Sequence, residues 1–267
     1  MPELPEIETI KRSLLPLTGE RIAEVDIRRG DIIRRQDFSP ALLQGIAWET
    51  ILRRGKYLGF SFGGGSRWLT VHLGMSGRFY QVEALPSEKH IHMVIALSGG
   101  SCLIFQDPRR FGGLWFTEGS AEPWRKLGPE PLEAGFTLVY LESILHPYKA
   151  AVKNILLNQE RIAGLGNIYV DESLFAAGIH PEKAGSQISR AECGRLHQAI
   201  IQILNQSIEA RGTTFRDYRD GWNQAGSFQE RLAVYGRGGE PCRICGNLIK
   251  TMRLGGRGTY YCSHCQT

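Results

Sequence analysis

The 267-residue sequence lacks long apolar runs, internal repeats and low-complexity tracts. No stretch approaches the ~18 consecutive apolar residues that a membrane-spanning helix needs. The first residues, MPELPEIETIKRS, contain acids and no apolar signal-peptide core, so we expect a cytoplasmic protein. Hydrophobic residues make up 42% and charged residues 22%, which excludes disorder of the whole chain. At roughly 150 residues per domain, the length predicts one large or two modest domains.

A strong excess of one charge sign is also absent. The 32 basic and 27 acidic side chains give a net charge of +5, which permits a nucleic-acid partner without requiring one. Much of the surplus lies in residues 226–267, which contain six basic and two acidic side chains. Part of it would balance the negative charge of a four-thiolate zinc site.

Cysteine is scarce, yet four of the six cysteines are regularly spaced, as Cys242-x2-Cys245-x16-Cys262-x2-Cys265. This spacing predicts one structural zinc ion, because each C-x2-C turn places two sulfurs on one side. Two disulfides are the alternative, which a reducing compartment disfavours. A catalytic zinc is disfavoured because four sulfurs leave no open position. We expect Cys102 and Cys193 to be inert buried thiols.

The segment between the two cysteine pairs, residues 247–261, is predicted to form a β-hairpin with a glycine-rich tip, Gly255-Gly256-Arg257-Gly258. Glycines allow the backbone to approach a ligand closely, and Arg257 can offer a bidentate fork to phosphate. The alternative is an ordinary solvated turn.

The first half of the chain has short β-rich runs after one helix. The helix is predicted over residues 6–15, before Pro16. Eight strands are predicted, over residues 22–27, 48–53, 57–62, 68–73, 79–82, 92–97, 102–105 and 113–116. Such a series predicts a β-sandwich or a flattened barrel. Residues 118–135, rich in proline and glycine, are expected to form a linker.

From residue 136 the pattern becomes helical. Ser189 and Glu192 form a capping-box signature before a helix that ends near Gly212. A second helix begins near Asn167, after a glycine-rich turn. The predicted fold is therefore α+β, with four segments: a β-sandwich domain over 1–117, a linker over 118–135, a helical domain over 136–225 and a zinc finger over 226–267.

The extreme N-terminus can support covalent chemistry. Pro2 is a small second residue, so removal of Met1 is expected and would expose a secondary amine. Free α-amino groups titrate near ~7.7–8.0, so a fraction is unprotonated at neutral pH. Attack on an aldehyde-level carbon would give an iminium ion, and Glu3 and Glu6 could transfer protons. The alternative is that these acids only stabilise the first turn of a helix.

Eight motifs in the same order resemble the formamidopyrimidine-DNA glycosylase family, whose members excise oxidised purines such as 8-oxoguanine. They are MPELPEIET, RRGKYL, HLGMSGRF, DPRRFGG, LGPEPL, AGLGNIYVDESLF, VYGRGGEPC and GGRGTYYC. With the closing cysteines they extend from residue 2 to residue 265. The resemblance implies a β-sandwich domain, a helix-two-turn-helix domain and a zinc finger, with DNA in the cleft between the two halves.

The resemblance also implies roles for individual residues. Pro2 corresponds to the nucleophile, Glu3 to the general acid and base, and Glu6 to a supporting acid. Lys56 corresponds to a lysine that contacts the phosphate beside the lesion. Arg257 and Asn167 correspond to residues that clamp the phosphates flanking the extruded nucleotide, and a helix start suits an anion on physical grounds alone.

Further DNA contacts are implied for His90, Met75, Arg109 and Phe111. Because Pro2 cannot reach a base inside a duplex, the nucleotide must be flipped out. Met75 and Phe111 would fill the vacated space and Arg109 would bind the orphaned base. The alternative places Met75 and Phe111 in the core at two strand-end turns.

Two stretches depart from the family pattern. Residues 217–229 occupy the place of a loop over the extruded base, but their centre, residues 219–224, cannot be assigned. This puts the base preference in doubt. Glu160 stands where some relatives carry a lysine that approaches the lesion.

The resemblance implies a bifunctional enzyme, a DNA glycosylase and abasic-site lyase, acting as a monomer on duplex DNA with damaged bases or abasic sites. Strand cleavage would follow by β- and δ-elimination, with zinc purely structural. Three alternatives stay open: an endonuclease VIII-like glycosylase for oxidised pyrimidines, a non-catalytic damage-binding protein, and a generic zinc-ribbon nucleic-acid binder. The intact Pro2, Glu3 and Lys56 favour an enzyme.

Overall fold

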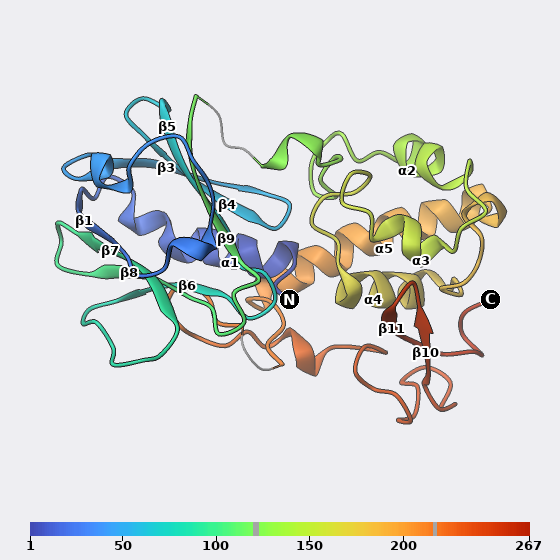
Figure 1. Cartoon of the computed structure of the whole chain (residues 1–267). Coiled ribbons are helices and arrows are strands. Elements are labelled where there is room, and N and C mark those ends of the chain that lie inside the picture. The colour runs from blue at the N-terminus through green and yellow to red at the C-terminus, as the bar shows by residue number, and fades with distance from the viewer. Residues whose placement is uncertain (120–122, 216–217) are drawn as a thin grey trace. The chain divides into compact units, whose positions relative to one another are not determined.

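The computed structural model of the protein describes residues 1–119, 123–215 and 218–267 (Figure 1). The chain folds into two compact units. The first comprises Met1–Lys126 and Ala210–Gln229, and the second comprises Leu127–Glu209 and Glu230–Thr267. The chain therefore returns to the first unit between the long helix and the zinc finger. The four predicted segment boundaries stay a prediction.

The first unit is built on two β-sheets, whose order is β1-β7-β8-β6 in one and β2-β9-β5-β4-β3 in the other. The strands are β1 (Ile22–Ile27), β2 (Ile33–Gln36), β3 (Trp48–Arg54), β4 (Tyr57–Phe62), β5 (Arg67–His72), β6 (Arg78–Val82), β7 (Ile91–Leu97), β8 (Cys102–Gln106) and β9 (Gly113–Glu118). Buried side chains of both sheets, including Phe105 and Phe116, share one hydrophobic core. The α+β class and the two-sheet domain are confirmed, and all eight predicted strands are present.

One strand of this unit was not predicted from the sequence. The short strand β2 pairs in parallel with β9 at the sheet edge. Its sequence, Ile33-Arg34-Arg35-Gln36, has one apolar residue and three exposed polar ones. An edge strand of this length buries too little apolar surface to produce a periodic pattern.

Helix α1 (Leu4–Leu14) closes the core of the first unit with Ile7, Ile10 and Leu14. It begins two residues before the predicted start. Pro5 fits the first helical turn because the amides there have no intrahelical acceptor.

Residues 120–122 of the expected linker over 118–135 lie outside the described residues. The Trp124 ring packs on β4 so closely that a Cβ atom at Gly59 would lie 2.4 Å from it. From Leu127 onward the chain belongs to the second unit, in which the Gly128 amide donates to the Gln159 carbonyl at 3.0 Å.

The second unit is helical and carries the hairpin. Its elements are α2 (Leu138–Leu145), α3 (Val152–Leu156), α4 (Asn167–Ala177), α5 (Arg190–Glu209), β10 (Lys250–Leu254) and β11 (Arg257–Tyr261). The predicted capping box is present, since the Ser189 amide donates to the Glu192 carboxylate at 2.9 Å and the Glu192 amide to Ser189 Oγ at 3.3 Å. Gly178, with φ of +71°, ends α4 in the left-handed conformation that glycine adopts without strain. Across the described ranges, no helix has the combination of length and apolar character needed to cross a membrane.

The two cysteines outside the zinc motif differ in burial. Cys193 in α5 is fully buried, and burial raises the pKa of its thiol to about 12, as expected of an inert thiol. Cys102 is half-buried, so its predicted burial was wrong. It lies at the first position of β8 and pairs with the last residue of β6.

Candidate active site and DNA-contact residues

The N-terminus is held by a reciprocal pair of hydrogen bonds at the start of α1. The Glu3 amide donates to Glu6 Oε2 at 2.8 Å, and the Glu3 carboxylate accepts from the Glu6 amide, which completes a capping box. Pro2, Glu3 and Glu6 are all buried. The two acids therefore do stabilise the first helical turn. Glu3 follows Pro2 in the chain, and these bonds hold its carboxylate in place, so the helix-capping role and a catalytic role are compatible.

Glu6 also binds the segment that follows α5. Its Oε1 atom accepts from the Thr213 amide at 2.8 Å. Its backbone carbonyl accepts from the Tyr218 hydroxyl at 3.3 Å. Burial, and then the charge of Glu6, holds the pKa of Tyr218 well above its usual value, so this hydroxyl keeps its proton. Glu6 is thus placed to act as a support for the N-terminus.

Lys56 lies at the turn between β3 and β4, directly after Gly55, whose φ of +55° lies in the left-handed region. Its side chain is buried, with 6% exposure. The neighbouring His72 has its Nδ1 atom 3.2 Å from the Gly74 amide nitrogen and its ring 4.7 Å from that of Tyr57. An Nδ1 atom that accepts a hydrogen bond belongs to a neutral imidazole. His72 therefore adds no positive charge beside Lys56.

The neutral state of His72 leads to a pH prediction for stability. Burial, and then the charge of Lys56, lowers the pKa of His72 to about 4. Between this value and the unfolded value of ~6.5, only the unfolded chain binds the proton, so the free energy of unfolding falls as the pH drops through this window. We expect wild type to lose about 2–3 kcal/mol more than His72→Asn between pH ~7.5 and ~4.5 in urea titrations. Equal losses would show that His72 is not held as a neutral ring in the folded protein.

The two loops that carry Met75 and Phe111 are joined through Asp107, which is fully buried. Its Oδ1 atom accepts from Ser76 Oγ at 2.6 Å and its Oδ2 atom accepts from the Gly112 amide at 2.8 Å. A Cβ atom at Gly74 would lie 2.5 Å from the Phe111 backbone, so the close approach of the loops requires glycine there. Sequence reasoning missed Asp107 and Ser76 as the residues that hold these loops.

The side chains at the ends of these loops point into solvent. Met75 is 44% exposed and Phe111 is 59% exposed, which rules out a place in the core. The Arg109 guanidinium carbon lies 5.2 Å from the centre of the Phe111 ring. His90 is exposed on a left-handed backbone, and its carbonyl accepts from the Asp107 amide at 3.0 Å. The segments that carry Met75, His90, Arg109 and Phe111 are thus tied to one buried aspartate.

The loop that the sequence could not assign is a turn around Asp220, which is fully buried. Its Oδ1 atom accepts from the amides of Trp222 and Gln224, both at 2.9 Å, and Oδ2 forms an ion pair with Arg211. The Trp222 ring is half-exposed and lies 5.2 Å from the Arg211 guanidinium carbon. Residue 217, the first of the predicted loop, lies outside the described residues.

In the second unit, the predicted phosphate-binding residues share one carbonyl group. Asn167 is the first residue of α4, and its Nδ2 atom donates to the Gly258 carbonyl at 2.8 Å. Arg257, the residue before Gly258, begins β11 and is exposed. The start of α4 and the hairpin arginine therefore lie side by side, and a helix N-terminus beside an arginine suits a phosphate.

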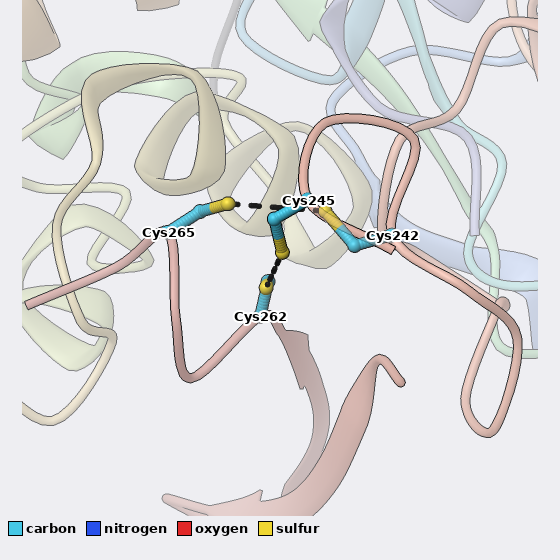
Figure 2. A group of neighbouring side chains, drawn as sticks. All are labelled: Cys242, Cys245, Cys262 and Cys265. Carbon is cyan, nitrogen blue, oxygen red and sulfur yellow. Dashed lines mark hydrogen bonds between the residues drawn. The ribbon is translucent and has the colours of Figure 1, made fainter. Parts of the chain in front are cut away.

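The four motif cysteines converge on one point (Figure 2). Their sulfur atoms all lie within 4.8 Å of one another, with 3.9 Å between Cys242 and Cys265 and 3.5 Å between Cys245 and Cys262. A zinc ion with bonds of about 2.3 Å to four sulfurs separates them by about 3.8 Å, so the cluster fits zinc. All six cysteines are free thiols, so the alternative of two disulfides is wrong. The prediction of one structural zinc is confirmed.

Family sequence models cover most of the chain. The model for the formamidopyrimidine-DNA glycosylase N-terminal domain matches residues 1–114, and that for the H2TH domain of the same enzymes matches residues 127–219. The model for a zinc finger found in FPG and IleRS matches residues 239–267.

Individual proteins agree with these matches. The formamidopyrimidine-DNA glycosylase of Syntrophomonas wolfei is 47% identical over 268 residues, which cover 100% of both sequences. The crystal structure of the Thermus thermophilus MutM (Fpg) protein has a TM-score of 0.90 and 37% identity, over 99% of this chain and 98% of that one. A Lactococcus lactis Fpg variant in complex with DNA containing Fapy-dG has a TM-score of 0.93 and 36% identity over 100% of both chains.

The two-sheet unit, the helical unit and the four-cysteine zinc finger together define a DNA glycosylase that acts on damaged DNA. The chain belongs to the formamidopyrimidine-DNA glycosylase family, whose enzymes combine glycosylase and abasic-site lyase activities. The resemblance drawn from the eight sequence motifs is thereby confirmed. A generic zinc-ribbon binder does not account for a match along the full length.

Proposed function

We propose that this enzyme excises oxidised purines, namely 8-oxoguanine and formamidopyrimidines, from duplex DNA and then cleaves the strand by β- and δ-elimination through an iminium ion on Pro2. The observation that carries the proposal is the buried capping box that fixes Glu3 beside Pro2. Solved relatives of the chain hold DNA with Fapy-dG and with a carbocyclic 8-oxoG, which supports the purine assignment. We further propose that it acts as a monomer in the cytoplasm.

The first stage is displacement of the base. Once Met1 is removed, the Pro2 nitrogen forms a bond to C1′ of the sugar, and the C1′–base bond breaks with its electron pair on the base. The N–H proton of Pro2 passes to the departing base, which restores the lone pair on the nitrogen. Glu3 donates a proton to O4′, the C1′–O4′ bond breaks, and the nitrogen lone pair forms the iminium double bond. A secondary amine gives an iminium that carries no N–H proton, so its positive charge persists.

Strand cleavage then follows from the iminium. Its charge acidifies C2′, and loss of a C2′ proton to a base such as the Glu3 carboxylate expels the 3′ phosphate in the β-elimination. Loss of a second proton, from C4′, expels the 5′ phosphate in the δ-elimination. Water finally hydrolyses the iminium and frees Pro2. The products are a one-nucleotide gap with phosphate at both ends and an unsaturated sugar fragment.

Product analysis on three duplexes tests this proposal. They carry 8-oxoguanine opposite cytosine, an oxidised pyrimidine, or no damage. We expect cleavage of the 8-oxoguanine strand to two phosphate-ended fragments, with at least a tenfold slower reaction on the pyrimidine lesion. Preference for the pyrimidine would favour the endonuclease VIII-like alternative. Binding without cleavage by protein with an unblocked Pro2 would favour a damage-binding protein.

The phosphate clamp predicts a specific salt dependence. The logarithm of the DNA association constant should fall linearly with the logarithm of salt concentration, with a slope of about −0.9 for each phosphate contact. Arg257→Ala should make this slope shallower by about 1 and weaken binding roughly tenfold. Arg190→Ala is the matched control, because Arg190 lies in the same unit with a side chain that is 81% exposed. Identical slopes for both variants would contradict the clamp role of Arg257.

A further inference from the structure

A fully buried ion pair lies beneath the hairpin of the second unit. Lys153 in α3 and Asp171 in α4 both have side chains with 0% exposure, and Lys153 Nζ lies 2.6 Å from Asp171 Oδ1. Removing two charges from water is costly unless each makes further hydrogen bonds. Neither residue has a role in the chemistry proposed for Pro2.

Both members of the pair hold the backbone of β11. Lys153 Nζ donates to the Gly258 carbonyl at 3.1 Å, and Asp171 Oδ2 accepts from the Tyr260 amide at 3.0 Å. The Gly258 carbonyl also accepts from Asn167 Nδ2 at 2.8 Å. The ion pair thus fixes the residue directly after Arg257 and shares an acceptor with Asn167.

The hairpin turn also approaches α3 closely. Gly255 has φ of +56°, and a Cβ atom there would lie 2.4 Å from Asn154 Oδ1. Asn154 is the neighbour of Lys153 in α3. Contacts from α3 therefore reach the hairpin on both sides of Arg257, at Gly255 and at Gly258.

We propose that Lys153 and Asp171 are positioning residues, which hold Arg257 in the arrangement beside Asn167 that clamps the DNA phosphates. This inference rests on the clamp described under the proposed function and extends it. An exposed arginine at a hairpin turn loses side-chain and backbone freedom when it binds phosphate. Gly258, which follows Arg257, and Tyr260 are held in place before DNA binds, which lowers that entropic cost. The ion pair therefore raises the affinity for DNA without contacting it.

The test replaces both partners, as Lys153→Met with Asp171→Leu, so that no unpaired charge is buried. Replacing a whole buried ion pair by apolar residues is often neutral for stability. We expect one zinc ion per chain and an unchanged midpoint of thermal unfolding. Affinity for a duplex with an abasic-site analogue should fall about threefold to tenfold, because the hairpin loses two anchoring hydrogen bonds.

A double-mutant cycle with Arg257→Ala gives the decisive readout. If the pair acts through Arg257, its replacement should cost little or no further affinity once Arg257 is alanine. Lys183→Met is the matched control: Lys183 lies in the same unit, and its ammonium forms a 2.7 Å ion pair with Glu192 of α5. It should leave DNA affinity unchanged in both backgrounds.

Each other outcome decides against the inference. Additive losses, or unchanged affinity in the pair variant, would overturn positioning while leaving the clamp intact. Loss of zinc would mean that the pair stabilises the finger as a whole and has no specific effect on Arg257. If Arg257→Ala itself left affinity unchanged, the proposed clamp would fail first, and the inference would fail with it.

Discussion

Pro2→Gly is expected to slow base excision and strand cleavage at least about a thousandfold, while lesion binding changes only a few-fold. Glycine leaves a primary amine at the N-terminus, whose imine loses its N–H proton and then no longer serves as an electron sink. The capping box is made by Glu3 and Glu6, so it survives the substitution. Single-turnover rates on an 8-oxoguanine duplex and equilibrium binding to an abasic-site analogue separate the two effects.

Pro16→Gly is the matched control for this experiment. Pro16 is exposed and lies in the short 3-10 helix Leu15–Leu17, at the opposite end of α1 from Pro2. Its replacement also removes a proline ring, yet rates should stay within about twofold of wild type. Near wild-type turnover by Pro2→Gly would mean that another amine attacks the sugar.

Cys245→Ser should abolish tight zinc binding and lower DNA affinity about a hundredfold. Structural zinc contributes on the order of 10 kcal/mol to the folding of small zinc modules, and a serine hydroxyl is a poor substitute for a thiolate. The apolar cluster around the finger is small, with Phe175, Val234, Cys242, Ile249 and Cys262 as its buried members. Without the metal, the two cysteine turns that flank the hairpin carrying Arg257 are no longer joined.

Zinc analysis after dialysis and fluorescence anisotropy with a lesion duplex measure the two losses together. Cys102→Ser is the control, because Cys102 is a half-buried cysteine of β8 in the first unit. It should keep one zinc ion and full affinity. A Cys245→Ser protein with full zinc occupancy would refute the four-thiolate site.

Local sequence signals predicted the elements that carry the site. The C-x2-C spacing identified all four zinc ligands, which lie together in the structure. Short β-rich runs between glycine-rich turns located the eight strands, and the Ser189–Glu192 signature located the start of α5. These features depend on residues within a few positions of one another, so a single sequence contains the information.

Features that depend on distant pairs could not be found in this way. Asp107 joins two loops that are about thirty residues apart, and it has the same local appearance as any aspartate before proline. Lys153 meets Asp171 and Gly258 only when α3, α4 and β11 come together. These charged residues hold distant segments together because they are buried, and burial depends on the whole fold.

The residue roles came from the family resemblance and stay predictions. For several of them, the structure shows exposure or contacts that agree with the predicted role. The exposure of Met75 and Phe111 removes the core alternative for both side chains. The capping box explains how acids that stabilise a helix also stand beside Pro2. The loop that the sequence left unassigned contains a turn held by the Asp220 carboxylate.

Borohydride trapping on an 8-oxoguanine:cytosine duplex, with an undamaged duplex alongside, tests the central claim most directly. Borohydride reduces an iminium to a stable amine, so it joins enzyme to DNA only where that intermediate forms. We expect a covalent adduct on the damaged duplex alone, mapped by peptide sequencing to Pro2. No adduct on the damaged duplex, with zinc bound and Met1 removed, would contradict the proposed mechanism.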